Sequence, residues 1–354
     1  MPLSVLSIEE NLIKYSKEKF PEREEIEIHE ITSLAKGWET ELFSFIYRYK
    51  QEEEEIERNL ILRIYPGSNL EEKTKWEFSV LRALFNAGYP VPETHMLELD
   101  TGYFGYPFIV MERIIGKDMG EEFTKAQQEK DFDKIVIDFY QIHSKLFVDL
   151  HNLDWKILSI DIETETEITP SYLLDRRIAN SERIIEQNQL QDMSPLFQWL
   201  KEKKSILLFD KISIIHQDFH PHNIMLSEDG KAYVIDWPAC YIGDFRQDLG
   251  WTLLLTGAYS TKPIRDMVLM YYEKARGSEV EDIEYFEILA AARRIMDILI
   301  FFKQSPETAG IREETIQQIK ETVFHLEYIA SFVKDKTSIS IPIFDELIQT
   351  ILKE

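Results

Sequence analysis

The chain has 354 residues, 44% of them hydrophobic, and a formal net charge of −24. This length allows two lobes or domains with large cores, and the acidic charge argues against partners such as nucleic acids and anionic membranes. The single cysteine, Cys240, excludes an intramolecular disulfide and favours a cytoplasmic location. No signal peptide is evident at the start of the sequence, and no apolar run approaches the length of a membrane span.

The first part of the chain predicts a β-rich region with two helices. Residues 8–19 and 69–88 have helical apolar spacing, and Gly88 is expected to end the second helix. The acidic tract 51–57 is expected to be the solvated tip of a hairpin. The β-prone runs are residues 26–34, 41–49, 60–65 and 108–111.

Gly37 follows the first of these runs, at a point where the chain is expected to turn back. A glycine at such a turn lets the backbone approach a phosphate closely, and the hydroxyl of Thr40 could add a further contact. The pattern GxxxxGK[ST] occurs nowhere, which disfavours a P-loop nucleoside triphosphatase.

Arg63 and Glu77 are charged residues at positions that the pattern otherwise makes apolar. Arg63 lies in the run Leu-Ile-Leu-Arg-Ile-Tyr, and Glu77 shares a helical stripe with three apolar residues. A buried carboxylate needs a cation, so the two side chains are expected to pair. Arg63 could then hold nucleotide phosphates, although a purely structural ion pair is the alternative.

The run 108–111 leads into a segment that contains Met111, Glu112 and Ile114. An extended link between two lobes leaves backbone N–H and C=O groups free, and the edge of an adenine or guanine could pair with them. The sequence therefore predicts that these residues contact the nucleotide base.

The rest of the chain is mainly helical in pattern. Residues 155–169 are polar and are expected to form a loop, and residues 262–354 have apolar helical faces. Further helices are predicted for residues 132–152, 171–188 and 195–204.

The segment from His216 to Asp236 interrupts these helices and carries the candidate chemistry. A short strand ends at His216, a polar loop contains Asp218 and Asn223, and Asp229-Gly230 predicts a two-residue hairpin turn. That turn would place Asn223 opposite Asp236. Paired oxygen ligands suit Mg²⁺, which takes its other ligands from water and substrate phosphate, and a free carboxylate such as Asp218 can accept the proton of an attacking hydroxyl. These parts predict phosphoryl transfer.

Two alternatives remain open for this segment. The histidines His216, His220 and His222, together with Asp218, are also ligand types for zinc. The aspartates could equally be ordinary turn and cap residues. Farther along, Asp248 begins an apolar stretch, so it is expected to cap a helix and to tie down nearby loop amides.

These residues resemble the aminoglycoside phosphotransferase and choline kinase superfamily, which has the protein-kinase-like fold. The resemblance spans about residues 34–251 and includes, in family order, LILRIYPG, PFIVMERIIG, IIHQDFHPHNIML, YVIDWPACYIGD and DLGW. It implies an α+β fold with two lobes: a small antiparallel-sheet lobe for the nucleotide, residues 1–114, and a larger, mainly helical catalytic lobe, residues 115–354.

The resemblance also implies a role for each site residue. Asp218 is the catalytic base or positions the acceptor hydroxyl, while Asn223 and Asp236 bind Mg²⁺. Arg63 replaces the nucleotide-binding lysine and is held by Glu77, and His216 and Asp248 brace the catalytic loop. Trp237-Pro238 follows Asp236 where a protein kinase has Phe-Gly, and no activation segment is evident, which favours a small-molecule kinase.

The expected function is transfer of the γ-phosphoryl group of ATP or GTP to a small alcohol by a monomer or weak dimer. The acidic charge favours an amine-bearing acceptor, of aminoglycoside type first and choline type second, unless that charge serves only solubility. A catalytically silent nucleotide-binding protein with a regulatory role is the alternative function.

Overall fold

The computed structural model describes residues 5–34, 40–67, 70–126, 132–160, 167–303 and 321–353. Packing divides the chain into two compact units, each assembled from separate stretches of sequence. The sheet unit comprises residues 1–128, 156–159 and 221–240, and the helical unit comprises residues 129–155, 160–220 and 241–354.

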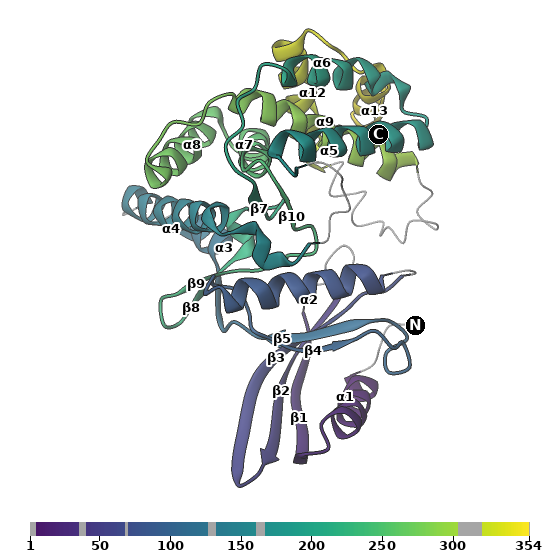
Figure 1. Ribbon diagram of the computed structural model, residues 1–354, viewed down its shortest axis with the longest axis vertical. Helices are drawn as coiled ribbons and strands as arrows, with labels where there is room; N and C mark the ends of the chain where they lie inside the picture. The colour runs from purple at the N-terminus through teal and green to yellow at the C-terminus, as the bar shows by residue number, and fades with distance from the viewer. Residues whose placement is uncertain are drawn as a thin grey trace. The chain divides into compact units, whose positions relative to one another are not determined.

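The sheet unit contains a five-stranded antiparallel sheet with the strand order β1-β2-β3-β5-β4. Consecutive strands pair as hairpins except that β5 lies between β3 and β4 (Figure 1). The strands are β1 (Arg23–Ser33), β2 (Glu41–Gln51), β3 (Glu54–Ile64), β4 (Thr94–Glu98) and β5 (Phe108–Glu112).

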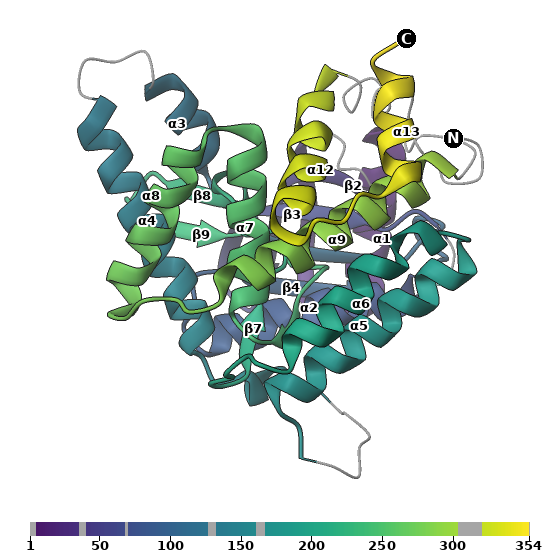
Figure 2. The same ribbon diagram turned by 90° about the horizontal axis from the view of Figure 1, so that it is seen from above.

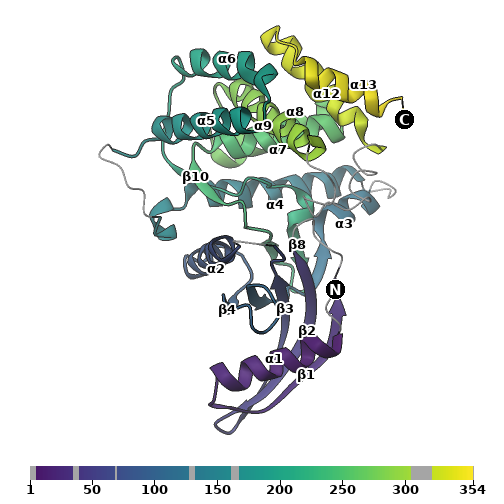
Figure 3. The same cartoon turned by 90° about the vertical axis from the view of Figure 1, so that its right-hand side faces the viewer.

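The two faces of this sheet bury different residues, because successive side chains of a strand point to opposite faces. Phe43, Phe45 and Tyr47 of β2 are buried with residues of α1 (Val5–Lys19), which runs alongside β1 (Figure 3). Arg63 of β3 belongs to the other set of alternating positions and contacts α2 (Glu71–Asn86). The face of the sheet that packs on α1 is thus apolar, whereas α2 makes a polar contact with the opposite face.

The hairpin between β2 and β3 is longer than the sequence predicted. We expected the acidic tract 51–57 to be a loop, but β2 extends to Gln51, β3 begins at Glu54, and only two residues form the turn. The tract is still exposed, and opposite charges across the strands stabilise it, as in the 2.6 Å contact between Arg48 and Glu57.

A second, three-stranded sheet in the same unit has the order β6-β8-β9 (Gly116–Asp118, Ile224–Ser227 and Ala232–Val234). The helix α3 (Met119–Ala126) and the 3₁₀ turn η3 (Pro221–Asn223) pack beside it. The prediction of a two-residue turn at Asp229-Gly230 is wrong. Leu226 pairs with Ala232, and Ser227 N–H donates to the Lys231 carbonyl, so the loop has one more residue and ends at Gly230, whose φ is +80°.

The helical unit contains nearly all of the remaining elements (Figures 1 and 2). The predicted helices 132–152, 171–188 and 195–204 are found within one residue of the expected bounds, while the 3₁₀ turn η1 (Trp155–Leu158) occupies part of the expected loop. The elements of the unit are α4 (Phe132–Asn152), α5 (Pro170–Gln187), η2 (Gln191–Met193), α6 (Ser194–Lys204), β7 (Ser213–Ile215), β10 (Tyr241–Gly243), α7 (Arg246–Tyr259), α8 (Lys262–Arg276), α9 (Ile283–Lys303), α12 (Val323–Thr337) and α13 (Pro342–Ile351).

The core of the helical unit is centred on α7 and α9, which are largely buried. Gly250 allows their close approach, because a Cβ atom there would lie 2.7 Å from the backbone of Phe286. Helices α5, α6, α12 and α13 cover the remaining apolar surface of this core. Among the described helices, none combines the length and apolarity that crossing a membrane requires.

An antiparallel sheet in one unit and helices in most of the other agree with the predicted α+β class. The strand β7 pairs with β10 in a short two-stranded sheet within the helical unit. This small sheet is the only departure from helix in that unit's described secondary structure. Its strand β7 directly precedes the loop that carries Asp218.

The contact at Gly250 makes a stability prediction. We expect Gly250→Ala to lower the free energy of unfolding by about 1–3 kcal/mol, because its methyl group meets backbone atoms that cannot move independently. Gly257→Ala on the same helix is the matched control, since its methyl group meets the end of the Tyr328 side chain, which can rotate away. Urea unfolding monitored by circular dichroism measures both, and an equal loss in the two variants would contradict the account.

Candidate active site

A buried carboxylate holds the loop after β7. Asp248 is fully buried, its Oδ2 accepts a hydrogen bond from the His216 N–H at 2.7 Å, and its Oδ1 accepts one from the Gln217 N–H at 2.8 Å. Gln217 has a φ of +78°, a conformation that a residue with a Cβ adopts at a cost. The two hydrogen bonds to one carboxylate stabilise this turn.

Asp248 does not occupy the position that the sequence predicted. The helix α7 begins at Arg246 with Phe245 at its N-cap, so Asp248 lies in the first turn rather than at the cap. A negative charge is favourable there because the first turn carries partial positive charge. His151 Nε2 also lies 3.4 Å from Oδ2, and its Nδ1 contacts the Tyr272 hydroxyl at 2.7 Å.

Asp218 follows this turn, and its carboxylate is 42% exposed. Trp251 Nε1 donates to its Oδ1 at 3.1 Å, and His220 Nε2 lies 3.3 Å from its Oδ2. The backbone N–H of Asp218 donates to Nδ1 of His216, which is itself buried. Burial raises the pKa of Asp218, but the contacts with His220 and Trp251 outweigh it and lower the pKa to about 2. The carboxylate is therefore ionised near neutral pH.

The sheet unit holds a second group of charges, centred on Arg63. Its two terminal nitrogens each lie 2.8 Å from a carboxylate, one of Glu77 and one of Asp236, and the Tyr65 hydroxyl donates to the other oxygen of Glu77. Glu77 is completely buried and Arg63 is 8% exposed. Burial raises the pKa of Glu77, and Arg63 opposes that rise.

Asn223 lies just before β8 and Asp236 lies two residues after β9, at the open end of that hairpin. The Ile235 N–H donates to the backbone carbonyl of Asn223 at 2.9 Å, so Asn223 faces Ile235 and not Asp236 as predicted. Asp236 has a φ of +70° and a side chain that is 43% exposed, whereas Asn223 is buried. The carboxylate of Asp236 is thus accessible to solvent, and the amide residue Asn223 lies at the same end of the hairpin.

The expected base-binding segment is only partly open. Met111 is paired within the sheet, the Glu112 N–H donates to the Glu93 carbonyl, and the Arg113 N–H donates to the Asn59 carbonyl. The expectation of free N–H groups is therefore wrong for residues 112 and 113. Ile114 makes no backbone–backbone hydrogen bond with another described residue.

The candidate phosphate loop can be followed in part. Thr40 is buried at the start of β2, and Gly37 lies outside the described residues.

The histidines proposed as zinc ligands have separate partners. His220 pairs with Asp218 in the helical unit, and His222 Nδ1 lies 3.1 Å from Asp118 in the sheet unit. Within the described ranges, no group of three or more His, Cys, Asp or Glu side chains is arranged to hold a metal ion.

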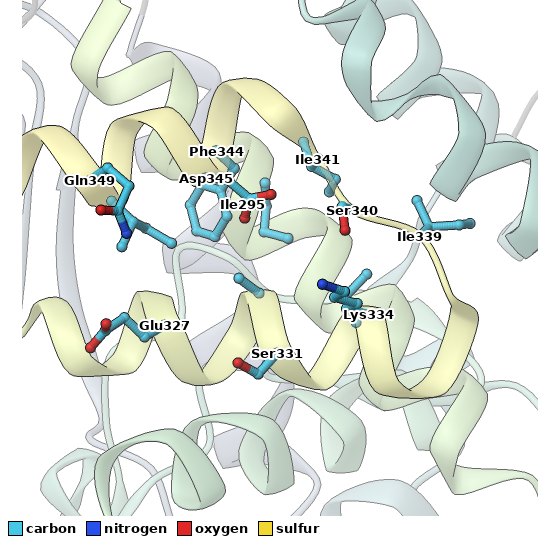
Figure 4. Close-up of a pocket in the computed structure, with 13 residues that line it drawn as sticks. Ile295, Glu327, Ser331, Lys334, Ile339, Ser340, Ile341, Phe344, Asp345 and Gln349 are labelled. Carbon is cyan, nitrogen blue, oxygen red and sulfur yellow. The ribbon is translucent and has the colours of Figure 1, made fainter.

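A cavity of about 310 Å³ lies elsewhere in the helical unit, between α12 and α13 (Figure 4). Glu327 and Lys334 of α12 face Phe344 and Gln349 of α13 across it. None of the residues predicted for the site lines this cavity.

Several contacts at the site were missed by the sequence reasoning. Tyr65 lies two residues after Arg63 in the run 60–65 that the sequence predicted as β-prone, so alternation could have placed both on one face. Trp251 lies three residues after Asp248, a spacing that puts both on one helix face. No signal of this kind exists for Arg177, which donates to the Gln217 side chain from α5.

Comparison with known proteins extends this description. The sequence model of the phosphotransferase enzyme family matches residues 30–286, which is most of the chain. Curated relatives include acyl-CoA dehydrogenase family member 10 of Mus musculus, 24% identical over 59% of this chain, and acyl-CoA dehydrogenase family member 11 of Homo sapiens, 25% identical over 75%. The chain spans only 19% and 37% of their lengths.

Solved structures share the fold at low sequence identity. A Ralstonia eutropha protein assigned to the aminoglycoside phosphotransferases has a TM-score of 0.63 at 15% identity, covering 92% of this chain and 98% of that chain. A thermostable mutant of an aminoglycoside phosphotransferase, in a ternary complex with AMP-PNP and hygromycin B, has a TM-score of 0.59 at 13% identity and covers 94% and 99%. A choline kinase of Streptococcus pneumoniae has a TM-score of 0.55 at 18% identity and covers 92% and 99%.

These matches confirm the protein-kinase-like fold and the superfamily predicted from the sequence. The chain belongs to the phosphotransferase enzyme family, which agrees with the enzyme class that the sequence predicted.

Proposed function

We propose that the protein transfers the γ-phosphoryl group of ATP or GTP to a hydroxyl group of a small molecule. The observation that carries the proposal is the loop at Asp218, where a buried carboxylate and a buried histidine hold an ionised, half-exposed aspartate. Neighbouring folds solved with AMP-PNP support a nucleotide as co-substrate. A silent nucleotide-binding protein would not need this arrangement.

In the proposed reaction the acceptor oxygen attacks the γ-phosphorus, and the bond from that phosphorus to the β,γ-bridging oxygen breaks. The nucleoside diphosphate leaves with the electron pair of that bond, and the proton of the hydroxyl passes to Asp218 or to solvent. A carboxylate with a pKa of about 2 is a weak base. We therefore assign Asp218 mainly to orienting the hydroxyl, whose proton is lost late.

The nucleotide would be bound by the sheet unit, for which we propose Arg63, held by Glu77, as a phosphate contact. Thr40, Gly37 and the segment of Met111, Glu112 and Ile114 remain proposed contacts for the phosphates and the base. The functional division into lobes 1–114 and 115–354 also remains a proposal.

The donor set fits Mg²⁺. Asp236 is half exposed beside Asn223, both supply oxygen, and Mg²⁺ takes few protein ligands when substrate phosphates complete its shell. Mg²⁺ bound there would neutralise charge on the phosphates. Asp236 also contacts Arg63, so the same carboxylate links the proposed metal site and phosphate site.

The acceptor is proposed as a small alcohol. An amine-bearing acceptor, of aminoglycoside or choline type, is supported by the net charge of −24 and by the names of the neighbouring folds. The positive charges of Arg177 and Arg293 next to the Asp218 loop act in the opposite direction at short range. A cytoplasmic monomer or weak dimer remains the simplest proposal for a chain whose one cysteine is buried and in no disulfide.

Removing the Asp218 carboxylate tests the reaction. We expect Asp218→Ala to lower kcat by at least about 100-fold while nucleotide affinity changes little, because the side chain acts on the acceptor hydroxyl. Asp138→Ala, at an exposed position of α4, is the control. Coupled-assay kinetics with a productive acceptor measure kcat, and calorimetry measures nucleotide binding. Full activity of Asp218→Ala would refute the proposal, and nucleotide binding with no turnover on any acceptor would favour the silent protein.

The buried charges at Arg63 make a stability prediction. Arg63→Met leaves Glu77 buried without its cation, so we expect unfolding free energy to fall by about 3–5 kcal/mol near neutral pH. The loss of Arg63 raises the pKa of Glu77 further above its unfolded value, so the variant should lose stability as pH rises above about 4. The double variant Arg63→Met/Glu77→Gln should recover part of the loss and lack this pH dependence. Denaturant unfolding at several pH values tests both statements.

Metal dependence is the next prediction. Because Asn223 and Asp236 offer oxygen ligands only, we expect Mg²⁺ or Mn²⁺ to support turnover and Zn²⁺ to fail. Asp236→Asn should raise the Mg²⁺ concentration needed for half-maximal rate by about tenfold or more. The measurement is a metal titration of chelator-treated protein, and stoichiometric zinc in the purified protein would instead support the histidine site.

A further inference from the structure

Two arginines of the helical unit reach the loop that carries Asp218. Arg177 of α5 donates to Gln217 Oε1 at 2.6 Å, and its guanidinium lies 4.5 Å from the centre of the Tyr241 ring. Arg293 of α9 lies 4.1 Å from the centre of the Trp251 ring, and its NH1 is 3.5 Å from the Gln217 carbonyl. Both cations therefore contact the residue that immediately precedes Asp218.

The carboxylates of Asp297 and Asp218 lie near these positive charges, but only Arg293 of the two arginines forms an ion pair in the described part of the chain. Arg293 pairs with Asp297, one turn farther along α9, at 3.4 Å. Arg177 forms no ion pair with any carboxylate in the described part of the chain, and its two contacts there are with a neutral amide and a neutral ring. Burial and then the charge of Arg177 lower the pKa of Arg293.

A purely structural role does not account for this charge. Gln217 has an unfavourable φ, and a hydrogen bond from Arg177 could help to hold it, but the buried carboxylate of Asp248 already fixes its backbone. Two cations next to each other repel, and the repulsion is offset when an anion binds between or beside them. A guanidinium presents its donors in a planar fork that matches a carboxylate or a phosphate.

We propose that Arg177 and Arg293 form the part of the acceptor site that binds an anionic oxygen group, so that the acceptor is an alcohol that also carries a carboxylate or a phosphate. The inference deepens the proposed function and rests on it. The net charge of −24 favours cationic acceptors only at long range, because charges beyond about 8 Å are largely screened at physiological ionic strength. The contacts of Arg177 and Arg293 with Gln217, the residue before Asp218, are much shorter than this screening distance.

The geometry also bears on the shape of such an acceptor. One indole ring, that of Trp251, touches both groups: its Nε1 donates to Asp218, and its face lies under Arg293. A hydroxyl at Asp218 and an anion at Arg293 would thus lie on opposite sides of contacts with a single indole ring, close to each other. A short, flexible linker between hydroxyl and anion fits this separation.

The test compares acceptors that differ only in charge. Short linear hydroxy acids of increasing chain length form the first arm, alcohol phosphates form the second, and the matching amino alcohols and diols form the third. Release of nucleoside diphosphate by the full chain with Mg²⁺ and ATP or GTP gives kcat and KM for each. We expect the highest kcat/KM in the first or second arm, and which of the two is higher identifies the anion.

Variants then connect the preference to the arginines. We expect Arg177→Met and Arg293→Met each to raise KM for the best anionic acceptor about tenfold or more, with a smaller change in kcat, since a charge-assisted contact is lost. Arg177→Lys should recover part of the affinity. Arg176→Met is the matched control, because Arg176 is the exposed neighbour on α5, and it should leave KM unchanged.

The outcomes separate the inference from the function on which it rests. If amino alcohols or diols are the best acceptors, or if Arg177→Met leaves KM for the best acid unchanged, the inference is wrong while phosphoryl transfer stands. If no member of any arm accepts phosphate although nucleotide binds, phosphoryl transfer to small alcohols fails and the inference fails with it. Preference for an anionic arm that depends on both arginines supports both proposals.

Discussion

The hydrogen bonds from two successive backbone N–H groups to the buried carboxylate of Asp248 determine the shape of the loop at Asp218. These bonds fix the peptide groups of His216 and Gln217, and the left-handed conformation of Gln217 then sets the direction in which the chain continues to Asp218, whose side chain is half exposed. The remaining contacts of the loop follow from this turn. His216, Trp251 and Thr252 each bond to a residue of the loop, the last through the Phe219 carbonyl.

Asp218 and Glu77 are both carboxylates of the proposed site, but they differ in burial and in what their charge does. Asp218 keeps a low pKa and partial exposure, so its charge is available to a ligand. Glu77 is completely buried and depends on Arg63 and Tyr65 for its neutralisation, so its charge serves to fix an arginine in place. An arginine held on two carboxylates has a defined position, which is what recognition of a phosphate requires.

The sequence predicted the elements and the chemistry of the site better than it predicted register and direction. Arg63, Glu77 and the segment from His216 to Asp236 could be identified because charged residues interrupt apolar patterns there. The hairpin register was wrong by one residue, since Asp-Gly also fits a longer turn that ends in a left-handed glycine. Arg177 and Arg293 could not be found, because which helix face meets the loop depends on the packing of α5, α7 and α9, and no local pattern encodes that packing.

The sheet unit is not a continuous piece of chain, and this has a consequence for biosynthesis. The hairpin β8–β9, with Asn223 and Asp236, belongs to the same compact unit as the five-stranded sheet, although β5 ends more than one hundred residues earlier. On a ribosome the amino-terminal unit therefore cannot finish folding until residue 240 has emerged, when a large part of the helical unit has already been synthesised. A nascent chain arrested before β8 has emerged would expose the β6 edge that β8 later covers. The folding of the two units is thereby coupled in time.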